Sequence, residues 1–218
     1  MLLLLFLLAN SAGAEAPAQE QASLPREFQE ISLLMSVEEV KKELKKLHLR
    51  ISEENIGSDP TLGLPYHDII VDNPPREFRS VIYSFYEGKL DSIRVEYNMQ
   101  NKSVDFEQVL LKLKEKYGEP DEALENSDPL FGIKTLDYRW RDAATQMQLG
   151  YSPPGKVPIF GQPHLGALAW NVFDRNLAQK SSEENERATR VFKERLKEKE
   201  LKEGGPIQGP AIKKRGSK

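Results

Sequence analysis

The sequence contains no cysteine, so disulfide bonds, thiol nucleophiles, thiolate metal ligands and a lipid-modified N-terminal cysteine are all excluded. This absence suits an exported protein that avoids unwanted oxidation. Histidine is also scarce, because the 218 residues include only His48, His67 and His164, which lie in separate segments without metal-site spacing. For His67, which precedes Asp68, we expect an exposed position at a strand edge rather than acid–base catalysis.

Motifs of the common enzyme classes are missing as well. The chain has no GxSxG nucleophile elbow, no HExxH zinc motif, no Walker A loop and no GxGxxG fingerprint after a strand. The oxygen ligands at 57–59 and 72–73 lack the spacing of a Ca²⁺ loop. We therefore expect a non-catalytic protein without a cofactor or metal. One alternative stays open: an enzyme, such as an envelope hydrolase, whose site is assembled from scattered residues.

The chain also lacks a strong net charge. It has 31 Lys and Arg against 34 Asp and Glu, which gives a formal charge of −3. No strong field points to nucleic acid or to an anionic membrane as a partner. The exception is the tail 204–218, which ends in Lys213-Lys214-Arg215 and Lys218. We expect this tail to be disordered and to make at most weak, salt-sensitive contact with an anionic surface.

The longest apolar run stands at the beginning of the chain. Leu2 to Leu8 are all apolar, and Ala12-Gly13-Ala14 follows as a small-x-small cleavage site. This pattern indicates a secretory signal peptide at 1–14, although no basic residue precedes the run. The alternative is an uncleaved anchor, which would need roughly 20 apolar residues. We expect cleavage, a periplasmic or secreted protein without a membrane span, and a flexible leader at 15–27.

Two helices are predicted by their caps and apolar stripes. Ser36 and Glu39 have the spacing of a capping box, and an apolar stripe that includes Val40 and Leu44 follows. Asp105 and Gln108 resemble a second capping box, and Gly118 is placed to end that helix. Between the helices, residues 49–65 are rich in Gly, Pro, Ser and Asp and indicate a loop, with a short strand at 66–71.

Alternation of apolar and polar residues predicts two hairpins and one further strand at 166–174. The first hairpin has its apolar residues at odd positions in both strands. A three-residue loop with Gly88 in the left-handed conformation would keep odd positions opposite each other. The predicted core comprises the following apolar positions: Tyr83, Phe85, Val95, Tyr97, Tyr138, Trp140 and Leu149. Trp140 and Trp170 alternate with other apolar residues, so we expect them in the core rather than on a ligand platform.

Together these elements predict an α+β fold, with an antiparallel sheet and helices on one face. The domain spans 28–175. We interpret it as a tandem repeat of α-β-β-β units at 28–100 and 101–175, because the two helices begin with similar sequences, MSVEEVKKEL and KSVDFEQVLLKL. A charged helix follows at 176–203, supported by i,i+4 pairs such as Glu183 with Arg187.

Several short sequence segments resemble those of a known group of proteins. They are Leu34-Met35-Ser36 with Glu38-Glu39-Val40, Gly88-Lys89-Leu90 after Phe85, Lys116-Tyr117-Gly118 with Pro120, and Trp140 with Asp142. Over roughly residues 28–175 the chain resembles a diffuse group of exported bacterial proteins. In layout it is similar to the beta-lactamase-inhibitor-protein-like fold and to the small outer-membrane-assembly lipoproteins, although it lacks their anchoring cysteine. The resemblance implies a non-enzymatic binder and supports the fold more than any activity.

Polar residues on the outward faces of the two hairpins are the candidate contacts for a partner. They are Arg94, Glu96, Arg139, Arg141, Gln146 and Gln148. The simpler alternative is a sheet face that only meets water, as antiparallel sheets commonly have. The sequence therefore predicts an exported binding or protein-interaction module of the cell envelope, whose partner is another envelope protein.

Overall fold

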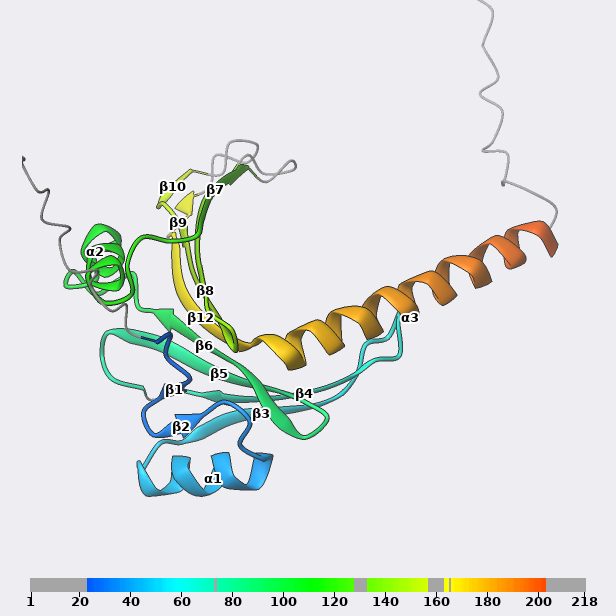
Figure 1. Cartoon of the computed structure of the whole chain (residues 1–218), viewed down its shortest axis with the longest axis horizontal. Coiled ribbons are helices and arrows are strands. Elements are labelled where there is room, and N and C mark those ends of the chain that lie inside the picture. The colour runs from blue at the N-terminus through cyan, green and yellow to red at the C-terminus, as the bar shows by residue number, and fades with distance from the viewer. Residues whose placement is uncertain (1–22, 73, 128–132, 157–162, 165, 203–218) are drawn as a thin grey trace, which may run out of the picture.

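The computed structural model describes residues 23–72, 74–127, 133–156, 163–164 and 166–202. The predicted signal peptide 1–14, most of the leader and the tail 204–218 lie outside the described residues. The described chain has an α+β fold, as the sequence predicts, with three helices and one large antiparallel sheet (Figure 1). Two short two-stranded sheets accompany it, β1 (Glu27–Phe28) with β2 (Ile31–Ser32) and β10 (Gly155–Lys156) with β11 (Pro163–His164).

Eight strands form the large sheet, in the order β3-β4-β5-β6-β12-β9-β8-β7. They are β3 (Ile51–Ser58), β4 (Pro65–Val71), β5 (Phe78–Tyr86), β6 (Lys89–Tyr97), β7 (Glu122–Ser127), β8 (Lys134–Arg141), β9 (Thr145–Ser152) and β12 (Ala167–Asp174). Each half of the chain contributes four strands that neighbour one another in sequence order. The last strands of the two halves, β6 and β12, pair antiparallel at the centre. The two halves are therefore arranged in mirrored order around the β6–β12 pair.

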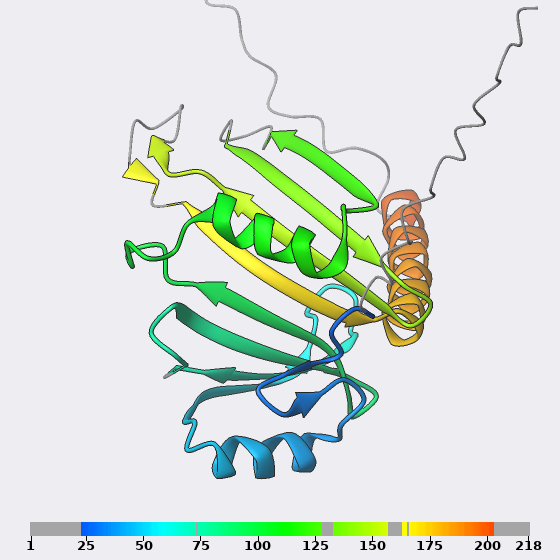
Figure 2. The same ribbon diagram turned by 60° about the vertical axis from the view of Figure 1, so that its left-hand side comes forward.

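Two helices cover the outer face of the curved sheet, α1 (Val37–Lys46) over the first half and α2 (Phe106–Tyr117) over the second (Figures 1 and 2). The capping box of Ser36 and Glu39 at α1 is confirmed. Asp105 caps α2 by accepting a hydrogen bond from the backbone N–H of Glu107, rather than through the predicted box with Gln108. Gly118 follows α2 with a φ of 82°, the left-handed region that favours glycine.

The predicted core lies between these helices and the sheet. Five of its seven predicted members are buried and two are partly buried against them: Tyr83, Phe85, Val95, Trp140 and Leu149, with Tyr97 and Tyr138. Val40 and Leu44 of α1 are also buried there, and the ring of Phe106 from α2 stacks on Tyr151 with centroids 4.1 Å apart. The helices are therefore held by apolar burial on one face of the sheet.

The β5–β6 hairpin reaches the predicted odd-to-odd pairing by another route. Glu87 and Gly88 have positive φ values, 51° and 73°, and form a two-residue turn. Such a turn pairs odd positions with even ones, and a bulge in β6 then shifts the register by one residue. The predicted three-residue loop is therefore wrong. The bulge leaves Leu90 in the core and turns Asp91 toward the opposite face.

The sequence pattern did not predict either of the two edge strands of the large sheet. The predicted loop at 49–65 is wrong, because it contains β3, and β7 was not predicted at all. An edge strand pairs on one side only and keeps much of its side-chain surface in water, so its sequence needs little apolar alternation. Ile56 in β3 illustrates this, since it is 70% exposed.

The N-terminal end of the described chain is anchored to the second half of the sheet. The backbone N–H of Leu24 donates to a carboxylate oxygen of Asp142, and Leu24 itself is buried. Arg26 forms an ion pair with Asp174 (2.7 Å) and also donates to the side chain of Thr145. Residues 24–27, which the sequence placed in the flexible leader, therefore lie on the fold.

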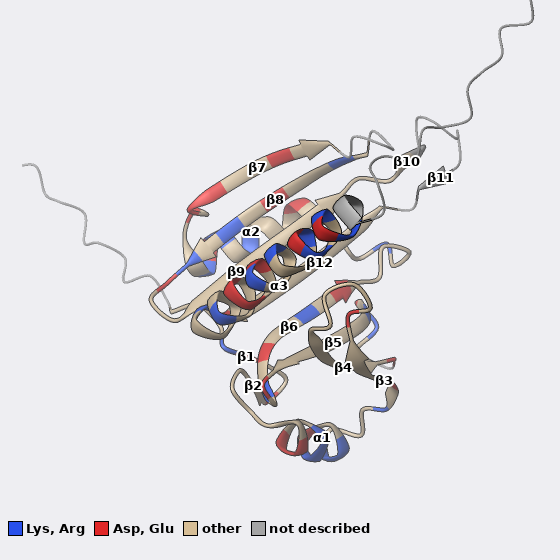
Figure 3. Cartoon of the chain, turned by 90° about the vertical axis from the view of Figure 1, so that its right-hand side faces the viewer, with Lys and Arg blue, Asp and Glu red and all other residues tan. Residues whose placement is uncertain are grey.

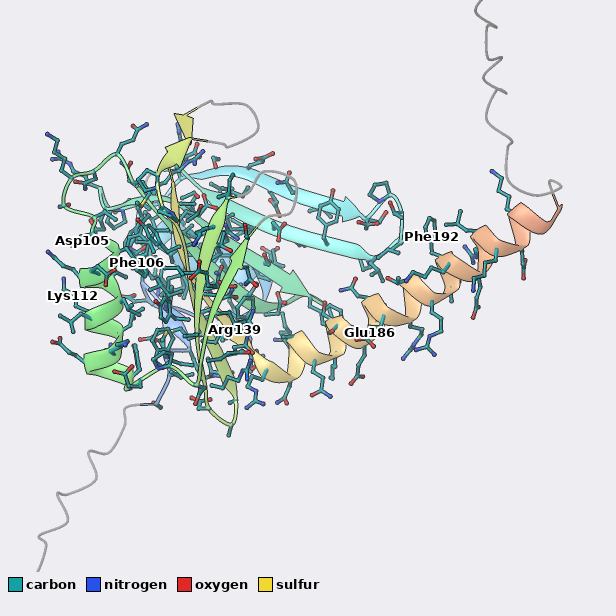
Figure 4. All side chains as sticks on the ribbon, turned by 90° about the horizontal axis from the view of Figure 1, so that it is seen from above. Asp105, Phe106, Lys112, Arg139, Glu186 and Phe192 are labelled. Atoms are coloured by element: carbon teal, nitrogen blue, oxygen red, sulfur yellow. The ribbon has the colours of Figure 1, made fainter. Side chains whose placement is uncertain are left out.

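The charged C-terminal helix is confirmed as α3 (Arg175–Lys202). Asp174 caps it by accepting hydrogen bonds from the backbone N–H groups of Asn176 and Leu177. The helix projects away from the sheet (Figures 1 and 4), and Val191 and Leu196 in the projecting part are 41% and 45% exposed.

Candidate functional site

The face of the sheet opposite α1 and α2, here called the inner face, carries the candidate residues. Arg94 of β6 pairs with Asn171 of β12, which pairs with Gln148 of β9, which pairs with Arg139 of β8. These four residues therefore form one row across four strands. Figure 3 shows basic and acidic positions along β6, β7 and β8, and Figure 4 shows Phe106 and Lys112 on the opposite side from Arg139, with α2.

The first group of candidates lies on β6. Arg94 donates through Nε to a carboxylate oxygen of Glu96 at 3.1 Å, and the Ser80 hydroxyl donates to the other oxygen of Glu96 at 2.9 Å. Glu96 is thus fixed between two donors. The Arg94 side chain keeps about half of its surface exposed, at 49%.

The second group lies on β8 and β9. Arg139 and Arg141 both bind the carboxylate of Glu122 in β7, at 3.1 and 2.9 Å. Gln148 donates to Asp137, and Gln146 extends the same face next to Arg141 in the β8–β9 register. All six candidates therefore share one face, but most are held by partners within the fold, so a ligand would compete with existing ion pairs.

The strand β12 lies between the two groups, and the sequence did not predict this position. β12 pairs with β6 on one side and with β9 on the other, so it brings Asn171 and Ala169 between the two groups. A strand pattern at 166–174 was visible, but a single strand's periodicity carries no information about its neighbours.

The first part of α3 runs over the inner face and leaves two cavities beside it. One, of about 710 Å³, lies between Ser92 and Phe173 of the sheet and the helix residues Asn185 and Thr189. The other, of about 270 Å³, lies toward β4. The Tyr86 hydroxyl bridges sheet and helix by donating to Glu184 at 2.8 Å. α3 thus covers the part of the inner face formed by β5, β6 and β12, and it leaves most of β8 and β9 uncovered.

Asp91 lines both of these cavities and is the most perturbed acid of the face. Burial, reinforced by the negative charges of Asp68 and Asp174, raises its pKa from 3.8 to about 6. One of its carboxylate oxygens is buried with no hydrogen-bond partner among the described residues. The alternation in β6 would place the odd-numbered Asp91 on the core face. The sequence did not indicate this residue, because only the bulge turns it away from the core.

Replacing Asp91 with asparagine is expected to stabilise the protein at pH 8 by about 3 kcal/mol, because burial raises the pKa of the Asp91 carboxyl group from 3.8 to about 6. Because the folded-state pKa lies above the unfolded value, the folded form binds the proton more tightly. The cost of ionising Asp91 is therefore absent below pH 4 and complete above pH 6. Urea unfolding of the wild type and of Asp91→Asn at pH 4 and pH 8 measures this difference.

The matched control is Glu77→Gln, at an exposed carboxyl group. This variant should differ from the wild type by similar amounts at both pH values. If Asp91→Asn gave no larger gain at pH 8 than at pH 4, the burial of the ionised Asp91 carboxylate would be contradicted.

The remaining candidates from the sequence take structural positions. Trp140 and Trp170 are 2% and 8% exposed, which confirms that they belong to the core. His67 lies in β4, the second strand of the sheet, where Nε2 contacts Glu54 at 2.8 Å, so its predicted position at a strand edge is wrong. In the ranges that the structure describes, no three His, Asp or Glu side chains are placed to hold a metal ion. Nor does any helix in those ranges have the length and apolar character needed to cross a membrane.

The model of the TP0088 domain matches residues 26–160. The chain belongs to the TP0088 domain family. The match begins one residue before β1 and ends before β12, so the TP0088 region contains seven of the eight strands of the large sheet. No curated protein and no solved structure matches the chain, so its similarity to the beta-lactamase-inhibitor-protein-like and lipoprotein folds stays a prediction.

Proposed function

We propose that this TP0088 family member is an exported, non-catalytic interaction module of the cell envelope, and that the inner face of its sheet binds another envelope protein. The observation that carries the proposal is the continuous polar row Arg94–Asn171–Gln148–Arg139 across four paired strands. A rigid sheet holds these side chains at fixed spacing, and paired charges of both signs favour a partner of complementary charge pattern.

The partial cover by α3 supports the same assignment. Interfaces combine polar groups with accessible apolar surface, and the cavity beside α3 places Phe173 next to polar groups of the sheet and the helix. The outer face, in contrast, is occupied by α1 and α2 and by the core beneath them.

Capture of partners from envelope extracts tests the proposal with two charge-matched variants. The inner-face variant Arg141→Glu with Gln146→Glu should lose the partners that the wild type retains. The control, Lys112→Glu with Gln108→Glu, makes the same change of charge at exposed positions of α2 and should retain them. Equal retention by both variants, quantified by mass spectrometry, would contradict binding at the inner face.

Export is tested separately from binding. The apolar run Leu2 to Leu8 and the site Ala12-Gly13-Ala14 support cleavage after Ala14. When the full sequence is expressed in a bacterium, we expect the protein recovered from the periplasm or medium to begin at Glu15. Intact-mass measurement decides the point, and a mature protein that still contains Leu2 to Leu8 would refute the cleavage.

A further inference from the structure

A cavity of about 580 Å³ lies at one end of the inner face, where β6 ends and β12 begins. This volume lies within the range of small-molecule sites, about 300–1,000 Å³. The cavity is distinct from the two that flank α3, because no residue of α3 lines it. Two arginines, Arg79 and Arg94, take part in its lining.

Both guanidinium groups retain donors for a ligand. Arg94 uses Nε to bind Glu96 and makes no other side-chain hydrogen bond to the described residues, which leaves both of its Nη groups. Arg79 is exposed, and its side chain has no hydrogen bond or ion pair within the described part of the chain. An arginine anchored through Nε presents its remaining N–H groups as a planar fork that suits a carboxylate.

The charges around the cavity favour a ligand with one negative charge. Asp72 and Glu96 also line it, so the lining itself holds two cations and two anions. Asp72 is paired from outside by Arg50 at 3.5 Å, which leaves an excess of one positive charge. The two negative charges of a phosphate dianion would outnumber this one positive charge, whereas the single charge of a carboxylate balances it.

The rest of the lining is mixed: Asn98 and Gln100 add polar groups, and the other residues are small, aromatic or apolar. Ala167 and Ala169 have no side chain beyond Cβ to fill the space, and Phe78 and Met99 add apolar side chains. Ala169 pairs with Glu96 across the β6–β12 junction, so its small side chain lies beside the residue that anchors Arg94. A ligand here would place its charge at the arginines and an apolar group over the alanines.

We infer that this cavity binds a carboxylate carried on a short apolar group, with Arg79 and Arg94 as the residues that bind the anion. The carboxylate is the C-terminus of a peptide that ends in an apolar residue, or that of a free medium-chain fatty acid. The inference rests on the proposed function, because the cavity forms one end of the same inner face, and it adds a ligand class that the polar row alone does not indicate.

The test titrates the ¹⁵N-labelled full chain with four probes and follows the amide and arginine Nε resonances. The probes are octanoate, the peptide acetyl-Gly-Leu-Leu with a free carboxylate, the same peptide as its C-terminal amide, and inorganic phosphate. We expect at least one carboxylate probe to bind, with the amide and phosphate much weaker. The free-acid and peptide sources are distinguished by which of the two carboxylates binds more tightly.

Three variants and one control assign the site. Arg94→Gln and Arg79→Gln should each weaken the carboxylate probe about tenfold or more, as expected for a lost charge-assisted pair. Ala167→Phe should block the cavity without changing its charge, at an exposed position where folding tolerates it. Arg195→Gln, an equal loss of charge on the exposed part of α3, should leave binding unchanged.

Four results would overturn the inference: no saturable shift with either carboxylate, tighter binding of phosphate, equal binding of the amide, or affinities unchanged in the arginine variants. The inner-face variant used for partner capture, Arg141→Glu with Gln146→Glu, lies outside this cavity. If that variant loses its partners and still binds the carboxylate probe, the cavity stands on its own. If partner capture is specific for the inner face and no probe binds, only the carboxylate inference fails.

Discussion

Replacing Trp140 with alanine is expected to lower the free energy of unfolding by about 3–5 kcal/mol. The side chain is 2% exposed, so its removal leaves a cavity in the core beneath α2. Its indole N–H also donates to the carbonyl oxygen of Gly118 at 2.8 Å, which ties β8 to the end of α2. Urea unfolding followed by circular dichroism measures the loss, with Trp170 left as a fluorescence probe.

Two further variants separate the contributions to this loss. Trp140→Phe keeps an aromatic ring but removes the hydrogen bond, so it should cost clearly less than the alanine variant. Tyr66→Ala truncates an aromatic residue that is 45% exposed, and it should cost less than about 1 kcal/mol. A loss below about 1 kcal/mol for Trp140→Ala would place this residue outside the core and would revive its role as a ligand platform.

The largest effect is expected from removing β12. A chain that ends at residue 160, the end of the TP0088 match, lacks the strand that pairs with both β6 and β9. It also lacks the buried side chains of Leu168, Trp170 and Val172, each worth about 1.5–3 kcal/mol of burial. This loss approaches or exceeds the stability of a typical domain, about 5–15 kcal/mol. We therefore expect no cooperative thermal transition for this truncated chain.

The control for that truncation is a chain that ends at residue 197. Side chains from 193 to 199 are exposed, so this shorter cut removes little burial. We expect its melting temperature to stay within a few degrees of the full chain. A drop of many degrees would mean that the end of α3 or the tail stabilises the fold. A cooperative transition of the chain ending at 160 would show that the seven remaining strands form a sheet without β12.

The sheet illustrates which parts of a fold are encoded locally. The hairpin β5–β6 was predicted because its two strands are adjacent in the chain and each alternates apolar and polar residues. β3 and β7 were missed because edge strands expose most of their side chains and carry no such alternation. The bulge at Asp91 was missed because one inserted residue leaves the surrounding pattern almost unchanged.

The candidate site shows the same division. Each hairpin's polar positions followed from its alternation, so Arg94, Glu96, Arg139 and Arg141 were placed on outward faces from the sequence. The Arg94–Glu96 ion pair is local, because the two residues are two positions apart in β6, whereas the ion pairs of Arg139 and Arg141 with Glu122 depend on the pairing of β7 with β8. Arg79 lies at a second register shift in β5, where alternation again fails to say which way a side chain points.

The sequence by itself determined the α+β class, the two capped helices, the aromatic core and the charged C-terminal helix. These features follow from periods of 3.6 and 2 residues and from caps, which depend on the nearest few positions along the chain. Only the tertiary structure decided that β12 lies between β6 and β9, that one inner face unites both hairpins, and that α3 crosses it. Those features depend on which distant segments pair most favourably, and the free energy of such pairing is a property of the whole packed sheet.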